Sequence, residues 1–285
     1  MIIAVGSDKG SPGATTLATV LGLAWPGDRV VCELDPRGAD LPFRLMHANG
    51  RHMPAQPSIA TLAVAARPGG PPAQLAQFAH PTVLGVPVIR GEVSTRASGK
   101  VAAHLPAIAQ LAAAWPGTVI ADVGSLQPSN PALVIAKAAS VVLLVMRPST
   151  EGLGHLRARV EELGEYVGDP SRERTSVGVV LVAGHRDEGA AVRRTRAVLD
   201  SIGSPAPVVG VFAHDPTSAA ALWSGPLTKK LIKSPLLTSV AQLVSEMWRL
   251  WPEAMSSVSW QSTHTAQPCD QHSAEQAADA PRVGA

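Results

Sequence analysis

Residues 2–16 read Ile-Ile-Ala-Val-Gly-Ser-Asp-Lys-Gly-Ser-Pro-Gly-Ala-Thr-Thr, and this stretch decides the fold. The apolar run Ile2–Val5 suits a buried strand, residues 6–13 contain three glycines and a proline, and Thr15–Ala24 has the pattern of a helix. A strand, a glycine-rich turn and a helix N-terminus together direct backbone N–H groups and the positive end of the helix dipole at one point. The stretch therefore predicts a βα unit whose turn could bind phosphate.

The turn departs at two positions from the common phosphate-loop pattern G-x-x-x-x-G-K-[ST]. Asp8 stands at the first glycine, and Ala14 stands at the lysine. Glycine-rich turns between a strand and a helix also occur without a ligand. The pattern alone thus leaves two interpretations open, a phosphate site and an ordinary βα turn.

The composition of the whole chain sets outer limits on its class. Its 285 residues are 46% hydrophobic and 4% aromatic, and the net charge of +2 does not demand a nucleic-acid partner. Only Cys32 and Cys269 occur, so no disulfide framework is implied and a reducing compartment fits best. The sequence shows neither a signal peptide nor an apolar run of about 18 residues. We therefore expect a cytoplasmic protein without membrane insertion.

Strand-like and helix-like segments alternate along the chain, and several strands are near-continuous runs of Val, Ile and Leu. Such runs are typical of strands covered on both faces, so we predict an α/β fold with a doubly wound, mostly parallel sheet and helices on both faces. The predicted strands are Ile2–Val5, Arg29–Leu34, Val83–Val86, Thr118–Asp122, Ser140–Met146, Val177–Val182 and Val208–Val211. The predicted helices are Thr15–Ala24, Ile59–Ala66, Pro106–Ala114, Pro131–Ala139, Gly152–Tyr166 and Glu188–Ile202.

The end of the chain differs in composition from the rest. From Ser234 to Trp251 apolar residues keep helical spacing, which predicts a final amphipathic helix packed on the domain. After residue 251 the chain is rich in Ser, Gln, Ala, Thr and His. We predict one domain over residues 1–251 and a disordered tail over residues 252–285. The Pro- and Gly-rich stretch at residues 67–72 and the stretch at residues 90–100 are predicted linkers.

Carboxylates follow two of the predicted strands. Glu33, Asp35 and Asp40 lie after the second strand, and Asp122 ends Val-Ile-Ala-Asp before Val-Gly. An Asp that enters a Pro-x-Gly turn often only caps the turn. A carboxylate at a strand end can also hold a water of a Mg²⁺ ion. Both interpretations stay open for each residue alone, and convergence at one sheet edge favours a site.

At these residues the sequence resembles the ParA/MinD family of P-loop ATPases. Lys9, Gly10, Gly13, Thr15 and Thr16 resemble that family's deviant Walker A motif, in which a signature lysine opens the loop. The segment from Glu33 through Asp35 is similar to the family's Asp-x-Asp-Pro-x-Gly, and Asp122 falls at its Walker B carboxylate. The resemblance covers roughly residues 1–250. It is strongest with an actinobacterial branch in which the second Walker A lysine is absent.

The resemblance implies ATP and Mg²⁺ as cofactors and gives each matching position a role. Lys9 would reach the partner's phosphates across a nucleotide-sandwich dimer. Thr15 and Asp122 would hold Mg²⁺, the latter through water, and Asp35 would position the attacking water, so Asp35 and Lys9 are the implied catalytic residues. The loop residues that would surround the phosphates are Lys9, Gly10, Ser11, Gly13, Ala14, Thr15 and Thr16.

Ala14 cannot supply the family's second lysine contact. Losing one charge-assisted interaction costs about 1.5 to 3 kcal/mol, which is roughly a 10- to 150-fold loss of affinity. A missing cation harms the transition state of phosphoryl transfer more than the ground state, so we expect nucleotide binding with weak or absent hydrolysis. Lys9 or Arg37 could compensate in part, although an arginine in such a turn is more often a solvated residue.

The family resemblance also implies partners. It implies a nucleotide-dependent homodimer and a protein partner, often proposed to be pilus or secretion machinery. The tail is neither basic nor periodic, which argues against membrane attachment through a terminal amphipathic helix. Two basic clusters could bind DNA non-specifically, but such clusters are usually solvated faces. They comprise Arg193, Arg194 and Arg196, and Lys229, Lys230 and Lys233.

Three functional hypotheses remain open at the level of the sequence. The chain could be a nucleotide-dependent dimerising switch that positions a larger assembly and hydrolyses ATP slowly if at all. It could instead be an active ATPase of the chromosome-partitioning type, or a scaffold that binds no nucleotide. The joint presence of Lys9, Thr15, Asp35 and Asp122 favours the switch.

Overall fold

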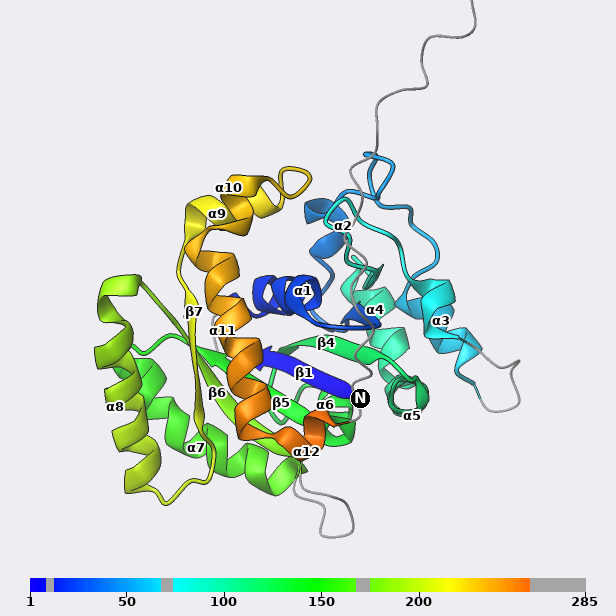
Figure 1. The fold of residues 1–285 in the computed structure, drawn as a ribbon. Coiled ribbons are helices and arrows are strands. Elements are labelled where there is room, and N and C mark those ends of the chain that lie inside the picture. Colours follow the sequence, from blue (N-terminus) through cyan, green and yellow to red (C-terminus); the bar gives the residue numbers. More distant parts are fainter. Residues whose placement is uncertain (9–12, 68–73, 168–174, 257–285) are drawn as a thin grey trace, which may run out of the picture.

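The computed structural model describes residues 1–8, 13–67, 74–167 and 175–256. A seven-stranded sheet forms the middle layer, with strand order β3-β2-β4-β1-β5-β6-β7, and every pairing between named strands is parallel (Figure 1). The predicted doubly wound α/β fold is thus confirmed. The strands are β1 (Ile2–Ser7), β2 (Arg29–Glu33), β3 (Val88–Ile89), β4 (Thr118–Ser125), β5 (Val141–Met146), β6 (Ser176–Ala183) and β7 (Val208–Ala213).

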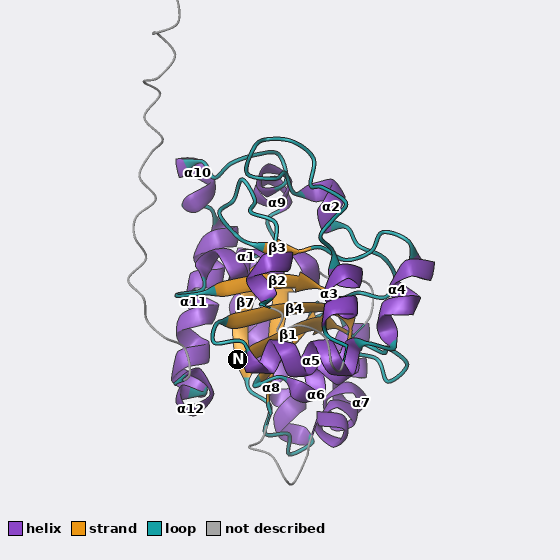
Figure 2. Cartoon of the chain, turned by 90° about the vertical axis from the view of Figure 1, so that its right-hand side faces the viewer, coloured by secondary structure: helices purple, strands orange, loops and turns teal. Residues whose placement is uncertain are grey.

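Helices cover both faces of the sheet and pack on two separate apolar clusters (Figure 2). The cluster on one face includes residues of α1 (Ala14–Ala24), α2 (Leu41–Arg44), α9 (Pro216–Leu222), α10 (Lys229–Ile232), α11 (Pro235–Leu250) and α12 (Pro252–Met255). The cluster on the other includes residues of α3 (Ile59–Ala65), η1 (Leu75–Phe78), α4 (Thr95–Ala102), α5 (Leu105–Ala114), α6 (Leu133–Ala138), α7 (Thr150–Val167) and α8 (Glu188–Ser201). A short 3-10 helix, η2 (His185–Asp187), precedes α8.

The strand β1 shows why the sequence forms this core. Its side chains alternate between the faces, so that Ile3 and Val5 join the cluster under α1, and Ile2 and Ala4 join the opposite cluster. All six residues of β1 are buried. A central parallel strand needs apolar side chains on both faces, which explains its continuous apolar run.

The topology brings three chain segments to one edge of the sheet. Because all strands are parallel, the carboxyl ends of β1, β2 and β4 lie at the same edge, next to the start of α1. The chain leaves β1 toward β2 and β3 and returns through β4 to β5 on the far side of β1. In open α/β sheets, ligands bind at the carboxyl ends of strands where the winding reverses in this way.

The predicted strand Val83–Val86 is wrong. Residues 82–85 form a turn, in which the Gly85 N–H donates to the Thr82 carbonyl and Gly85 has a φ of +74°. The edge strand is instead β3, and it follows Pro87. Leu84 and Val86 are nevertheless buried, so their hydrophobicity reflects packing and not strand pairing.

Two further boundaries differ from the prediction. The predicted linker at residues 90–100 contains most of helix α4, whose Val101 is buried in the apolar cluster with α3 and α5. Past residue 251 the chain continues into α12, whose Met255 is fully buried. Regular structure therefore extends beyond the predicted start of the tail, while residues 257–285 lie outside the described residues.

Candidate functional site

The start of α1 carries no side-chain cap within the described residues. Gly13 has a φ of +104°, a left-handed conformation that side chains disfavour, and its carbonyl accepts the first helical hydrogen bond, from the Leu17 N–H at 2.8 Å. The first turn of this described helix also carries no acidic residue. Its N–H groups and the positive end of the dipole remain available to a phosphate.

The loop positions divide into described and undescribed ones. The predicted residues Lys9, Gly10 and Ser11 lie outside the described residues. Ala14 is 5% exposed and belongs to the apolar cluster under α1, and Thr15 and Thr16 are half-buried. A small apolar side chain at position 14 therefore fits its surroundings.

Asp122 lies opposite α1 at the carboxyl end of β4. Val5 pairs with Asp122 while Gly6 pairs with Gly124, so Val123 is an extra residue, as in a β-bulge. Asp122 is 1% exposed, and its Oδ1 accepts the Gly124 N–H at 3.1 Å. Its Oδ2 is buried and has no hydrogen-bond partner among the described residues. A buried carboxylate oxygen without a donor is rare, so it indicates a partner that the described residues do not provide.

The electrostatics of Asp122 agree with a cation site. Burial raises the pKa of its carboxyl group to about 6, while the Thr15 hydroxyl, the Gly124 N–H and the Arg37 charge act to lower it. A divalent cation would stabilise the ionised form, and carboxylate and hydroxyl oxygens are ligands that Mg²⁺ prefers. Asp122 and Thr15 therefore fit the predicted metal role.

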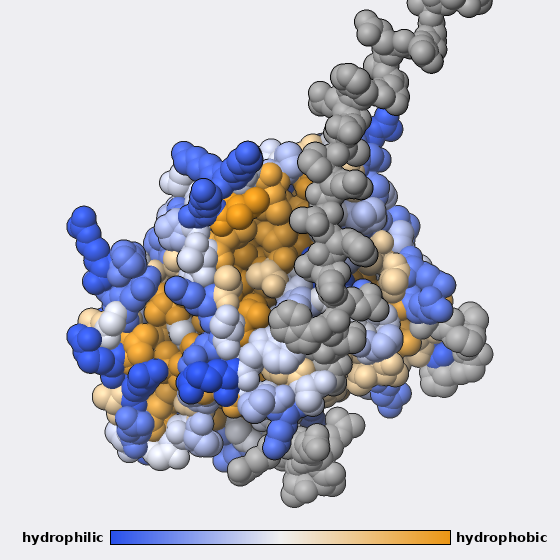
Figure 3. Space-filling view, viewed as in Figure 1, coloured by the Kyte–Doolittle hydropathy of each residue, from blue (hydrophilic) through white to orange (hydrophobic). Residues whose placement is uncertain are grey.

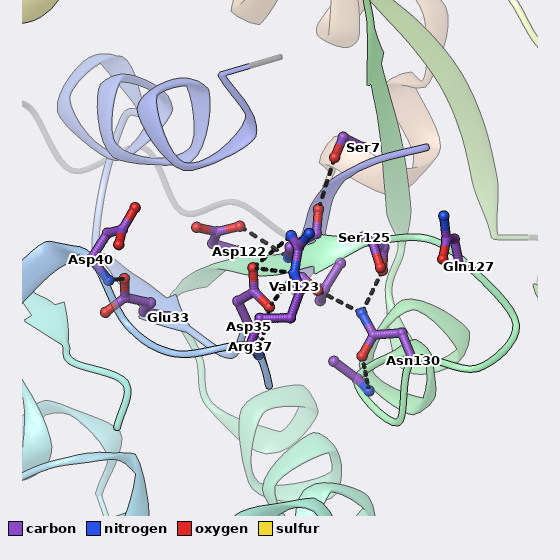
Figure 4. A network of polar contacts seen from close by, with 12 residues as sticks. Ser7, Glu33, Asp35, Arg37, Asp40, Asp122, Val123, Ser125, Gln127 and Asn130 are labelled. Carbon is purple, nitrogen blue, oxygen red and sulfur yellow. Dashed lines mark hydrogen bonds and ion pairs between the residues drawn. The ribbon is translucent and has the colours of Figure 1, made fainter. Parts of the chain in front are cut away.

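Asp35 lies beside Asp122 and is held by the arginine two residues later. The Arg37 side chain donates from Nη2 to Oδ2 at 2.8 Å and from Nε to Oδ1 at 3.1 Å, and its backbone N–H also donates to Oδ1. A Cβ at Gly124, which has a φ of +69°, would overlap the Asp35 carboxylate. Figure 4 shows Asp35, Arg37 and Asp122 grouped at the end of β4. The structure thus brings the predicted water-positioning residue next to the predicted metal residue.

Glu33 has a structural role in the described chain. It is 2% exposed, and its carboxylate accepts three backbone N–H groups, from Asp40 at 2.7 Å, Leu41 at 2.8 Å and Gly91 at 3.1 Å. Burial raises the pKa of Glu33 to about 7, against the effect of these donors. Glu33 therefore ties the turn after β2 to the turn after β3.

Asp8, at the position of the pattern's first glycine, also has defined partners. The Arg159 Nε of α7 donates to Asp8 Oδ1 at 2.6 Å, and both side chains are about 15% exposed. The Gln127 side chain donates to the Asp8 carbonyl at 3.1 Å. These contacts anchor the end of β1 on α7 and on the segment after β4.

Thr15, Asp35 and Asp122 meet at one edge, whereas Asp40 pairs with Arg44 at 2.6 Å and is more than half exposed. Reasoning from the sequence did not identify Gly124 as the residue that leaves room for Asp35. The glycine two residues after Asp122 was the signal that could have indicated it. Arg37 is more than half exposed, yet it is paired with Asp35, so a description as a merely solvated turn residue is incomplete.

The rest of the described surface adds little to this site. Both basic clusters are exposed, one on α8 and one on α10, and Figure 3 shows hydrophilic side chains over both helices. In the described ranges no group of three or more His, Cys, Asp or Glu residues could hold a metal. None of the helices there is long and apolar enough to cross a bilayer. Cavities of about 580 and 720 Å³ lie near the amino ends of the strands, away from Asp122.

Solved structures share this architecture. The chain is similar to the cell division ATPase MinD of Pyrococcus furiosus, at 22% identity and a TM-score of 0.62 over 87% of this chain and 98% of that one. The fold is that of the MinD and ParA ATPases. MinD of Pyrococcus horikoshii, complexed with Mg-ADP, matches at 20% identity and a TM-score of 0.64, covering 87% and 96% of the two chains. A ParA family ATPase of Chlorobium tepidum matches at 14% identity and a TM-score of 0.62, covering 84% and 96%.

Sequence comparison adds no further assignment. No family model matches the chain, and no curated protein matches it. At these identities the similarity establishes the fold alone. Function must therefore be argued from the residues at the carboxyl edge of the sheet.

Proposed function

We propose that this chain is a nucleotide-dependent switch of the ParA/MinD type. It binds ATP with Mg²⁺ in the cytoplasm, forms a homodimer when nucleotide is bound, and hydrolyses ATP weakly or not at all. Its dimer positions or regulates a larger assembly, such as partitioning, pilus or secretion machinery. The observation that carries the proposal is the buried Oδ2 of Asp122 near Thr15 at the start of α1, where the described residues supply neither a partner for this oxygen nor a side-chain cap for the helix.

The described residues divide the work of binding. The first N–H groups of α1 would bind phosphate oxygens, and Thr15 and Asp122 would hold the metal. When bound, Mg²⁺ neutralises phosphate charge. One solved structure of this fold, from Pyrococcus horikoshii, is described as a complex with Mg-ADP, which supports the choice of ligands.

One feature of the loop supports weak turnover. Ala14 contributes no positive charge, and its side chain is buried among apolar residues. Catalysis of phosphoryl transfer depends mainly on positioned charges, so this loss reduces the rate more than the affinity.

The dimer and the signature lysine form the family-based part of the proposal. Lys9 would contact the partner's nucleotide, and the loop Ser11-Pro12-Gly13 without a second lysine would be the normal form in an actinobacterial branch. Lys9 would then replace, from the second subunit, part of the charge that Ala14 lacks.

Isothermal calorimetry and light scattering on the full chain test the proposal. We expect wild type to bind Mg-ATP and a non-hydrolysable analogue and to become dimeric with the analogue. Lys9→Ala should bind at least about 10-fold more weakly, because it loses a charge-assisted contact. Lys137→Ala, which changes a lysine on α6, is the matched control and should behave like wild type.

Three outcomes would overturn parts of the proposal. If wild type binds neither nucleotide, the chain is a scaffold and not a switch. If Lys9→Ala binds as tightly as wild type, the role of Lys9 is wrong. If wild type releases phosphate rapidly with Mg²⁺ and Asp35→Ala abolishes this activity, the chain is an active ATPase.

A further inference from the structure

Arg37 lies beside two carboxylates at the carboxyl edge of the sheet. Its guanidinium contacts both carboxylate oxygens of Asp35, and its charge acts on the buried Asp122. Asp35 itself packs against the backbone of Gly124, directly after the segment that carries Asp122. The arginine thus stands at the same edge of the sheet as the unpartnered Oδ2.

The pair that holds Arg37 is well formed but exposed. Arg37 keeps 56% of its side chain exposed, whereas Asp35 keeps 16%. Water screens the charge of the half-exposed guanidinium, so this pair is weaker than one in which both partners are buried. Exchange of Asp35 for another anion at Arg37 therefore costs less than breaking a fully buried pair.

We propose that Arg37 senses the terminal phosphate of a nucleoside triphosphate: without nucleotide it pairs with Asp35, and with a triphosphate it binds that phosphate and releases Asp35. This inference rests on the proposed nucleotide site and adds a residue to it. Arg37 then supplies within one subunit the positive charge that Ala14 does not provide.

The chemistry of the two anions explains the exchange. The planar fork of arginine binds a carboxylate or a phosphate equally well in geometry, with two parallel N–H donors. A terminal phosphate carries more negative charge than a carboxylate and is brought close to Asp122 by the metal. A diphosphate lacks this group, so Arg37 stays on Asp35 when ADP is bound.

The test measures the affinity of the full chain for a non-hydrolysable ATP analogue and for ADP, both with Mg²⁺. Arg37→Gln should lower the affinity for the analogue by roughly 10-fold or more, because it removes a charge-assisted contact. The affinity for ADP should stay within about 2-fold of wild type. Arg37→Lys should recover part of this loss, because it restores the charge without the fork. Asp35→Asn removes the ion pair that holds Arg37 and should raise the affinity for the analogue by up to about 5-fold.

Arg44→Gln is the matched control, because Arg44 forms a similar exposed pair with Asp40 on the same connection. It should leave both affinities unchanged. If wild type binds both ligands and Arg37→Gln binds the analogue equally well, Arg37 is not a phosphate sensor although the nucleotide site stands. An equal loss for analogue and ADP would also contradict the sensor. If wild type binds neither ligand, the proposed function itself fails. Circular dichroism of each variant confirms that it is folded.

Discussion

Two buried carboxylates lie side by side in this sheet and differ in their partners. Glu33 on β2 and Asp122 on β4 are paired in register, and they are 2% and 1% exposed. Glu33 accepts three backbone N–H groups, so each of its oxygens has a donor. Asp122 accepts one, and its second oxygen has none in the described part of the chain.

The two buried carboxylates differ in whether the described chain satisfies their oxygens with hydrogen bonds. Burial and a raised pKa are common to both residues, so neither property identifies the site. The distinguishing property is the unsatisfied oxygen, which is costly unless a ligand compensates it. The unsatisfied oxygen of Asp122 therefore lowers the stability of the described chain, whereas Glu33 organises the turns around it.

The largest expected effect is on the pH dependence of stability. The folded pKa values of Asp122 and Glu33 are raised to about 6 and about 7, so the folded state binds more protons than the unfolded one above about pH 4. Both groups stabilise the fold at low pH, and this contribution is lost as the pH rises through 6 and 7. Each shift corresponds to about 3 kcal/mol, so the two together correspond to about 6 kcal/mol.

Urea denaturation of the nucleotide-free chain between pH 4.5 and 8 measures this contribution. The free energy of unfolding should fall more steeply with pH in wild type than in Asp122→Asn, in which one titrating group is removed. Identical slopes in the two proteins would mean that Asp122 does not titrate with a raised pKa.

A smaller effect is expected from removing the satisfied carboxylate. Glu33→Ala leaves three buried N–H groups without an acceptor, which should lower the free energy of unfolding by about 3 kcal/mol. The midpoint of thermal unfolding should fall by roughly 6 to 12 °C for a domain of this size. Asp40→Ala, in the same connection between β2 and α2, is the control and should lower the free energy of unfolding by less than about 1 kcal/mol. Equal effects of the two variants would show that the Glu33 contacts contribute little.

The smallest expected change in stability has the opposite sign. Asp122→Asn removes a buried charge and can keep the hydrogen bond from Gly124, at the cost of a buried amide group that lacks an acceptor. At pH 8 we expect the nucleotide-free chain to gain about 1 kcal/mol. Thermal unfolding of the two nucleotide-free proteins measures this change in stability. A destabilised variant would show that Oδ2 accepts a hydrogen bond from a donor within the chain.

The sequence predicted the central strands well because each carries its own signal. β1 begins Ile-Ile-Ala-Val and β5 reads Val-Val-Leu-Leu-Val-Met, and every residue of both strands is buried, as is typical of parallel strands covered on both faces. The run Val83–Val86 is also mostly apolar, but Gly85 turns the chain and Pro87 follows. Its side chains are therefore buried although its backbone does not pair as a strand of the sheet. Helix α4 was missed because Gly99, Ser98 and Lys100 make it look like a linker.

The candidate site was predictable only in part. Asp35 and Asp122 could be found because each lies at the end of a predicted strand, and Thr15 through the resemblance of its loop to the Walker A motif. The difference in hydrogen bonding between Glu33 and Asp122 could not be predicted, because the donors to Glu33 include Gly91, which is 58 residues away along the chain. Such a pairing leaves no local pattern in the sequence.

The most direct test of the nucleotide site is the shift in thermal unfolding that ATP causes with Mg²⁺ and with a chelator. Binding to the folded state raises the unfolding temperature in proportion to the free energy of binding. For wild type we predict a clear increase with Mg-ATP that falls sharply with the chelator, and for Asp122→Asn little difference between the two conditions. A shift in wild type that does not depend on Mg²⁺, or the same Mg²⁺ dependence in Asp122→Asn, would contradict the role of Asp122.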